Sequence, residues 1–288
     1  MYFIEETDKP KLLSKIFFIP VLQREKIILP INCEDIIQNK NIEIKQKERN
    51  NRNEVKLAQK TKKILDKTHC KKVILSKKMQ KREVFCNQLH TYGFEIINGR
   101  WLFSVLSSRA IEYVVKQNQM LEEKINISIM INDLNDIIIE NIKQMVKKYK
   151  SINIVTNHIE KFKKIENQIL EEYGIMITLN NNRKKSLTKS DIILNVDFPM
   201  ELINRYTIAE KAIIINLKGN IKIKQKRFEG KVFNNYEIMH ENLEDFEYDK
   251  SDKYFSKDIY EALIYKQQPI ENIMKKIEKD KVKIIQLI

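Results

Sequence analysis

Residues 127–155 read ISIMINDLNDIIIENIKQMVKKYKSINIV, in which two short apolar runs flank a segment with helical spacing. The runs Ile127–Ile131 and Ile152–Val155 are apolar on nearly every residue, whereas a strand with one wet face alternates apolar and polar residues. Between them, apolar side chains recur at the three- and four-residue spacing of a helix with one buried side, as at Ile138 and Ile142. Strand, helix and strand in this order predict two parallel strands joined by a crossover helix.

The same alternation continues on both sides of this stretch. Further runs rich in Ile and Val predict strands at 73–75, 94–97, 175–179, 192–196 and 212–217. Helices are expected at about 54–67, 100–119 and 159–173, and Gly93 and Gly174 stand where a helix ends in a left-handed residue. We therefore predict an α/β fold with a doubly wound, mostly parallel sheet.

Composition divides the 288 residues into five segments. They are a small N-terminal module (1–37), a polar linker (38–53), a helix followed by a βαβα segment (54–124), the main α/β domain (125–218) and a C-terminal extension (219–288). The linker is predicted because its residues offer almost no apolar surface to bury. The extension ends in an apolar run, Val282–Leu287, which we expect to be a strand that joins the N-terminal region.

Glycine is scarce, with 5 residues where average usage of about 7% would give roughly twenty. They are Gly93, Gly99, Gly174, Gly219 and Gly230. No pair has the spacing of a Walker A loop or of the G-x-G-x-x-G dinucleotide motif. The sequence therefore excludes a standard phosphate-binding loop of either kind.

Lys and Arg number 53 against 39 Asp and Glu, a formal net charge of +14. Such a chain attracts polyanions, but its lysines are spread over many segments, and no aromatic residues are interleaved to stack on bases. Nucleic-acid binding is an open alternative that the sequence does not favour.

The location of the protein is predicted from its apolar runs, its start and its cysteines. No apolar run approaches the 18 or so residues of a membrane span, and the acidic residues Glu5 and Glu6 are unlike a signal peptide. Cys33, Cys70 and Cys86 are odd in number and far apart, which is typical of free thiols in a reducing compartment. We expect a cytoplasmic protein without membrane partners.

Three motifs follow one another in the main domain. Residues 153–161 read NIVTNHIEK, residues 190–199 read SDIILNVDFP and residues 212–217 read AIIINL. Together they resemble successive strands of the NAD(P)-binding domain of shikimate dehydrogenases and glutamyl-tRNA reductases. The resemblance covers about 125–218 and implies a Rossmann-like domain with a nucleotide site at the carboxyl edge of its sheet.

The first turn of this domain departs from the family. Residues 132–136 contain two carboxylates and no glycine, although a dinucleotide's pyrophosphate approaches the backbone of this turn closely. Asp136 is expected to cap the following helix. Two unit charges about 5 Å apart repel by roughly 3 kcal/mol at an effective dielectric constant of 20, so dinucleotide binding is expected to be lost.

The resemblance places five residues at the candidate ligand site. They are Asn132, Asp133, Asn157, His158 and Asp197. Asn157 stands where NAD-selective domains have an acid, and an Asn followed by basic residues, here Lys161, Lys163 and Lys164, is tolerated by NADP users. The cofactor is therefore left unknown, with NADP as one possibility. Asp197 either contacts a ligand or caps the helix near Pro199.

Catalytic and metal sites are not identified. The catalytic Lys and Asp of shikimate dehydrogenases have no counterpart in residues 1–124, so no catalytic residue is carried over. The four histidines are scattered, and the acidic stretch 237–252 lacks EF-hand spacing, so a solvated loop and no metal site are expected.

Three functions stay open. The first is a Rossmann-like protein that has lost dinucleotide catalysis and binds a small ligand or a protein partner. The second is an NAD(P)-dependent oxidoreductase of the shikimate dehydrogenase type, and the third is a nucleic-acid-associated basic protein. The glycine-free turn favours the first over the second, and whether the chain is an enzyme is left open.

Overall fold

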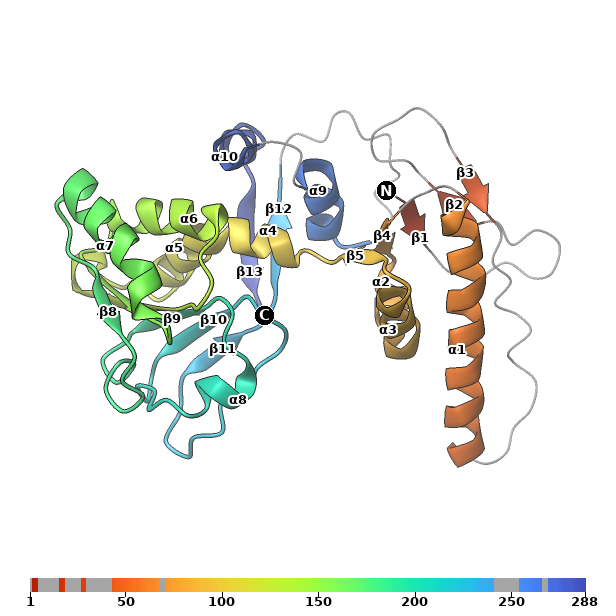
Figure 1. The fold of residues 1–288 in the computed structure, drawn as a ribbon, viewed down its shortest axis with the longest axis horizontal. Helices are drawn as coiled ribbons and strands as arrows, with labels where there is room; N and C mark the ends of the chain where they lie inside the picture. Colours follow the sequence, from red (N-terminus) through yellow and green to blue (C-terminus); the bar gives the residue numbers. More distant parts are fainter. Residues whose placement is uncertain are drawn as a thin grey trace. The chain divides into compact units, whose positions relative to one another are not determined.

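The computed structural model describes residues 2–4, 16–18, 27–29, 43–67, 71–240, 254–265 and 269–288 (Figure 1). The chain forms two compact units. Unit 1 comprises residues 1–99 and 245–265, and unit 2 comprises residues 100–244 and 266–288.

Unit 2 is built on one six-stranded parallel sheet. Its strands are β6 (Asn126–Met130), β7 (Ser151–Val155), β8 (Thr178–Asn180), β9 (Ile192–Asn195), β10 (Ile213–Asn216) and β11 (Lys231–Phe233). They lie in the order β8-β7-β6-β9-β10-β11, and every neighbouring pair is parallel. Counted along the chain this is 3-2-1-4-5-6, the doubly wound Rossmann order, which confirms the predicted fold class.

The two faces of this sheet are covered differently. Helices α4 (Arg100–Val105), α5 (Ser107–Gln117), α6 (Asp136–Val146) and α7 (Ile159–Tyr173) lie on one face (Figure 1). The 3-10 turn Glu122–Lys124 lies between α5 and β6 along the chain. On the other face, the connections over the described residues 181–191 and 217–230 contain no α-helix, and the short helix α8 (Met200–Ile203) lies between them. Irregular chain therefore takes the place of helices on this second face.

An apolar core holds the irregular segments on the second face. It joins Met130, Val155 and Ile193 of the strands to Leu187 and Ile208 of the irregular chain, all at most 6% exposed. Phe198 and Tyr206 add an edge-to-face ring pair with centroids 5.9 Å apart. Burial on both faces explains why the strands are apolar on consecutive residues.

The C-terminal part of unit 2 forms a separate antiparallel pair. Strand β13 (Lys283–Leu287) pairs with β12 (Tyr236–Met239) after helix α10 (Ile270–Lys279). The final strand is thus confirmed, but the prediction that it joins the N-terminal region is wrong. Its partner β12 packs against helix α4, where Tyr236 stacks on Phe103 with ring centroids 4.3 Å apart.

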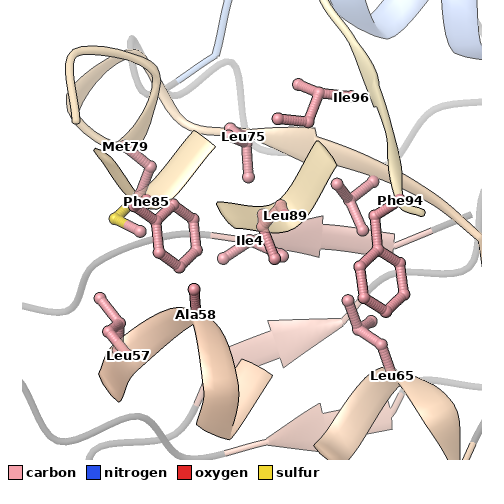
Figure 2. Packing of buried hydrophobic residues seen from close by; sticks show 11 residues of the cluster. Ile4, Leu57, Ala58, Leu65, Leu75, Met79, Phe85, Leu89, Phe94 and Ile96 are labelled. Atoms are coloured by element: carbon pink, nitrogen blue, oxygen red, sulfur yellow. The ribbon is translucent and has the colours of Figure 1, made fainter. Parts of the chain in front are cut away.

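Unit 1 contains a three-stranded parallel sheet in the order β1-β4-β5. Its strands are β1 (Tyr2–Ile4), β4 (Lys72–Leu75) and β5 (Glu95–Ile97), its helices are α1 (Glu43–Asp66), α2 (Lys77–Gln80), α3 (Glu83–Thr91) and α9 (Ser256–Ile264), and β2 (Ile16–Phe18) pairs antiparallel with β3 (Ile27–Leu29). Figure 2 shows the core between α1, α3 and the sheet, where Leu57, Phe85 and Leu89 pack around Ile4.

Two predicted helices differ in extent. Helix α1 begins at Glu43, not near residue 54, so it includes most of the segment predicted as a linker. The polar residues 43–53 are rich in Glu, Lys, Gln and Arg, which have a high intrinsic preference for helix. The helix predicted at 100–119 is two helices, α4 and α5, divided at Leu106. Gly93 and Gly174 have the predicted left-handed conformation, with φ of 81° and 66°.

Several predictions fall outside the described residues. These are Cys33, Cys70, His69 and most of the acidic stretch 237–252, of which Glu237 lies in β12. Within the described chain, no helix is both long and apolar enough to cross a bilayer.

Candidate functional site at the carboxyl edge of the sheet

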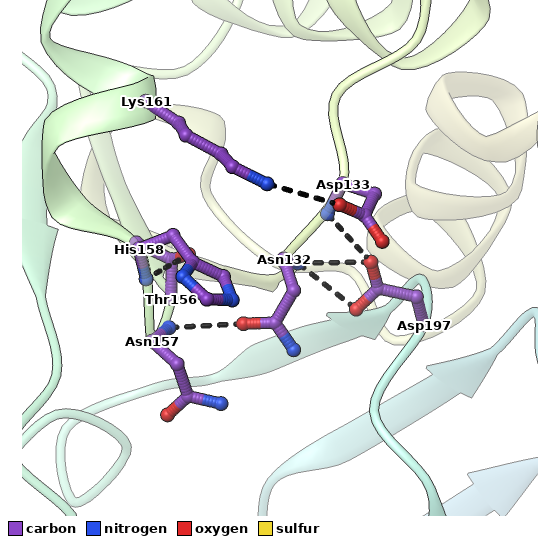
Figure 3. Close-up of polar contacts among 7 residues, drawn as sticks. All are labelled: Asn132, Asp133, Thr156, Asn157, His158, Lys161 and Asp197. Atoms are coloured by element: carbon purple, nitrogen blue, oxygen red, sulfur yellow. Dashed lines mark hydrogen bonds and ion pairs between the residues drawn. The ribbon is translucent and has the colours of Figure 1, made fainter.

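The turn after β6 is bound by a carboxylate from the turn after β9. The backbone N–H of Asn132 donates to Asp197, with distances of 3.0 Å to Oδ1 and 2.9 Å to Oδ2, and the N–H of Asp133 donates to Oδ2 at 2.8 Å (Figure 3). The half-buried Asp197 carboxylate thus engages two consecutive amides, as a bound anion would.

Strand register explains this contact. β6 and β9 are adjacent and parallel, with Met130 opposite Asn195. Two residues further along each strand direction, Asn132 and Asp197 face each other. An acid at this position therefore reaches the neighbouring turn without any special loop conformation.

The same register links the turn to β7 on the other side. Met130 is opposite Val155, and two residues later the Asn157 N–H donates to Asn132 Oδ1 at 2.9 Å. The His158 N–H donates to the hydroxyl of the buried Thr156 at 3.1 Å. Asn132 therefore links the ends of β9 and β7. Its backbone N–H donates to Asp197, and its side-chain oxygen accepts from the Asn157 N–H (Figure 3).

Asp133 and Lys161 form an ion pair at the rim of the site, with the two charged atoms 3.4 Å apart. The Asp133 side chain is 84% exposed and that of Lys161 58%, so solvent screens the pair and it adds little stability. Lys218 donates from Nζ to the backbone carbonyl of Asp197 at 3.0 Å. Positive charges of Lys161 and Lys218 and the negative charge of Asp133 therefore lie around the Asp197 turn.

The caps of the two helices at this edge differ from the predictions. Asn135, not Asp136, caps α6, and its Oδ1 accepts from the Ile138 N–H at 3.0 Å. Asp136 is already in the first helical turn, where its charge favours the positive end of the helix but its side chain is past the capping position. The N-cap of α8 is Pro199, so Asp197 caps no helix.

A chain of asparagines, which the sequence analysis did not identify, orders the rest of this edge. Asn195 Nδ2 donates to Asn216 Oδ1 at 2.8 Å, and Asn216 Nδ2 donates to Asn234 Oδ1 at 2.8 Å. Asn195 and Asn216 are fully buried, and each also bonds its own turn, through Phe198 and Gly219 respectively. The sequence signal was available, because an Asn ends two successive apolar strands.

All five predicted site residues lie at this edge. Asn132, Asp133, Asn157 and Asp197 are joined by hydrogen bonds, and His158 follows Asn157 at the exposed start of α7. Among the residues that the structure describes, no cluster of His, Cys, Asp and Glu is arranged to hold a metal ion. The amides that a pyrophosphate would bind in a Rossmann turn are satisfied by the protein's own carboxylate.

Comparison with known proteins yields no matching family model and no matching curated protein. Among solved structures, a putative malic enzyme (malate oxidoreductase) is 15% identical with a TM-score of 0.29, and the match covers 50% of this chain and 41% of that chain. A shikimate 5-dehydrogenase-like protein is 14% identical with a TM-score of 0.23, over 43% of this chain and 44% of that one.

A third similar structure is the NAD-complexed D-isomer specific 2-hydroxyacid dehydrogenase from Lactobacillus delbrueckii ssp. bulgaricus. It is 13% identical with a TM-score of 0.26, over 56% of this chain and 59% of that one. The chain thus matches between 41% and 59% of the length of these three proteins. The Rossmann-like assignment rests on the strand order of unit 2.

Proposed function

We propose that unit 2 is a Rossmann-like module that has lost dinucleotide binding and acts by binding another ligand or a protein partner. The observation that supports this is the Asp197 carboxylate, which accepts from the amides of Asn132 and Asp133. These amides belong to the first turn of the domain, where the pyrophosphate lies in dinucleotide-binding Rossmann domains.

The energetics weigh against a dinucleotide at this turn. A phosphate would first have to displace Asp197, and each hydrogen bond to a charged group contributes about 1.5–3 kcal/mol. If Asp197 stayed within about 5 Å, its charge would repel the phosphate by roughly 3 kcal/mol at an effective dielectric constant of 20. The absence of glycine from residues 132–136 adds side chains where the backbone would have to be bare.

The alternative is an NAD(P)-dependent oxidoreductase with an unusual turn. The Rossmann strand order and the lysines after Asn157 are compatible with it. The Asp197 carboxylate on the amides of Asn132 and Asp133, however, weighs against a pyrophosphate at this turn. The arrangement therefore favours the non-catalytic module.

Thermal unfolding with NADP, NAD and ATP tests the proposal. A ligand present at about 100 times its dissociation constant stabilises the folded state by about 2.7 kcal/mol, which is easily measured. We expect no saturable shift for the wild-type protein with any of the three. A saturable shift with NADP or NAD would favour the oxidoreductase instead.

Two alanine variants separate the role of Asp197 from a general effect of lost charge. Asp197→Ala frees the amides of Asn132 and Asp133, and we expect this variant to gain weak binding of inorganic pyrophosphate. Asp191→Ala is the matched control, because Asp191 accepts from the Asn126 N–H at the opposite edge of the same strands at 2.9 Å. Equal pyrophosphate binding by both variants would contradict the role given to Asp197.

A further inference from the structure

The irregular face of unit 2 concentrates positive charge. Three segments cover it, residues 183–189, 205–211 and 218–231, which we call the basic face. Their cationic side chains are all exposed: Arg183, Lys184, Lys185, Lys189, Arg205, Lys211, Lys218, Lys222, Lys224, Lys226, Arg227 and Lys231. The same segments contain two acidic residues, Glu210 and Glu229. Lysines that are dispersed in the sequence therefore gather on one surface.

Hydrogen bonds hold these segments side by side. The Thr207 N–H donates to the Arg183 carbonyl at 2.8 Å, which joins the first segment to the second. Gln225 Nε2 donates to the Tyr206 carbonyl at 2.6 Å, and the Glu229 N–H donates to the Glu210 carbonyl at 2.8 Å, which join the second to the third. Apolar residues of the same segments belong to the buried core, so the backbone that carries the charges is anchored to the sheet.

The helical face of the same unit has no such excess. On α7, Lys161, Lys163 and Lys164 are offset by Glu160, Glu166, Glu171 and Glu172. Lys163 pairs with Glu160 at 2.7 Å, and Lys143 of α6 pairs with Glu172 at 3.2 Å. Within the described part of the chain, no ion pair involves a cation of the basic face. The asymmetry is therefore local and does not follow from the overall net charge alone.

We propose that the basic face binds the phosphodiester backbone of a nucleic acid. This goes beyond the proposed function, because Lys218 is the one cation of the basic face that bonds Asp197 among the described residues, and the inference does not depend on whether a dinucleotide binds. Closely spaced Lys and Arg side chains neutralise successive phosphates and release condensed counterions. The three segments contain two acidic residues and twelve cations, so they repel a negatively charged nucleic-acid backbone little.

The apolar residues of the unit favour a nucleic acid over an anionic membrane. The large apolar side chains exposed in the described residues are Leu121, Leu170, Met176, Met239, Ile285 and Ile288, and none lies on the basic face. A membrane surface site usually adds apolar side chains that enter the acyl region. The aromatic rings near the face, Tyr206 and Phe228, are buried and half-buried, so bases have no stacking platform and binding is expected to tolerate any sequence.

Fluorescence anisotropy with the full chain tests this proposal. The probes are a labelled single-stranded RNA and a single-stranded DNA of the same sequence, a DNA duplex, and vesicles that contain phosphatidylserine. We expect saturable binding of nucleic acid at about 100 mM salt, with log K falling linearly against log salt. The three nucleic-acid probes show which backbone is preferred. No binding at this salt concentration, or tighter binding to the vesicles, would overturn the proposal.

A matched pair of variants locates the surface. The first replaces Lys222, Lys224, Lys226 and Arg227 by Gln, and the control replaces Lys147, Lys161, Lys163 and Lys164, exposed lysines of the helical face, by Gln. Both remove four positive charges. We expect the first to weaken binding at least tenfold and to reduce the salt slope on duplex by about 3. The control should change the affinity less than threefold. Equal losses in the two variants would mean attraction by net charge alone and would overturn the proposal.

Discussion

Asp191 and Asp197 flank strand β9, and each binds an end of the neighbouring strand β6. Asp191 Oδ2 accepts from the Asn126 N–H at 2.9 Å at the amino end, and Asp197 Oδ2 accepts from the Asn132 N–H at 2.9 Å at the carboxyl end. Both contacts follow from one register, in which Ile127 is opposite Ile192 and Met130 is opposite Asn195. The two acids that flank β9 thus bind both ends of β6, and Asp197 occupies the backbone amides of the turn after the first strand of the Rossmann-like sheet.

The first prediction concerns how much the hydrogen bonds of Asp197 and Asp191 stabilise the protein. Asp197→Ala should lower the free energy of unfolding by about 2 kcal/mol, because it leaves the amides of Asn132 and Asp133 without a charged acceptor. Asp191→Ala, which releases one residue at an exposed position, should lower it by about 1 kcal/mol. Urea unfolding monitored by circular dichroism measures both. A larger effect for Asp191→Ala would contradict the claim that the hydrogen bonds of Asp197 to Asn132 and Asp133 stabilise the fold more than those of Asp191.

The second prediction concerns the buried asparagine chain. Asn216→Ala should destabilise the protein by about 2–3 kcal/mol, because it removes the acceptor of the buried Asn195 amide and a donor to Asn234. Asn220→Ala is the control, since Asn220 is exposed and should cost less than about 1 kcal/mol. The same unfolding experiment distinguishes them, and equal effects would mean that the chain adds no stability.

The third prediction compares two glycines. Gly174→Ala should cost about 1 kcal/mol, because φ is 66° but no atom lies within 4 Å of the added Cβ. Gly230→Ala should cost more, since its Cβ would overlap the carbonyl oxygen of Ala212 and force the backbone before β10 to move. Melting temperatures of the two variants give the order, and the reverse order would contradict a close approach of the Gly230 backbone to the Ala212 carbonyl.

The fourth prediction is a pH dependence at Cys86. Burial, aided by the negative charge of Glu54, raises the pKa of the Cys86 thiol to about 11. Because a raised pKa disfavours the thiolate, the native protein at pH 8 should alkylate at Cys86 about a hundredfold more slowly than the unfolded chain. The rate should rise as the pH approaches 11. Mass spectrometry of the Cys86 peptide after iodoacetamide treatment measures it, with the guanidinium-unfolded protein as control. Native and unfolded rates within threefold of each other would refute this assignment.

The fold class and the buried strands of the six-stranded sheet could be predicted from the sequence, because burial on both faces of a parallel strand leaves a direct signature in consecutive Ile and Val residues. Strands β11 and β12 were not predicted, because they are short, partly exposed and mix polar with apolar residues. The Rossmann-like order of unit 2 was likewise expected from the motifs at 153–161, 190–199 and 212–217. All five candidate residues lie at the predicted edge because parallel strands end together there.

The contacts within the site could not be predicted in the same way. Whether Asp197 meets a ligand, a helix or a neighbouring amide depends on the register between β6 and β9, which no local pattern determines. The choice of Asn135 over Asp136 as the cap depends on a helix start one residue earlier than expected. The basic face depends on which irregular segments pack together, and its lysines carry no periodicity that reports this.

The most direct test of the central claim follows the backbone amides of Asn132 and Asp133 by nuclear magnetic resonance during titration with NADP. If Asp197 holds these amides, their ¹⁵N–¹H resonances stay in place in the wild-type protein up to millimolar NADP, and they move in Asp197→Ala even without ligand. A saturable shift of both resonances in the wild-type protein would show phosphate at the turn and would contradict the loss of dinucleotide binding.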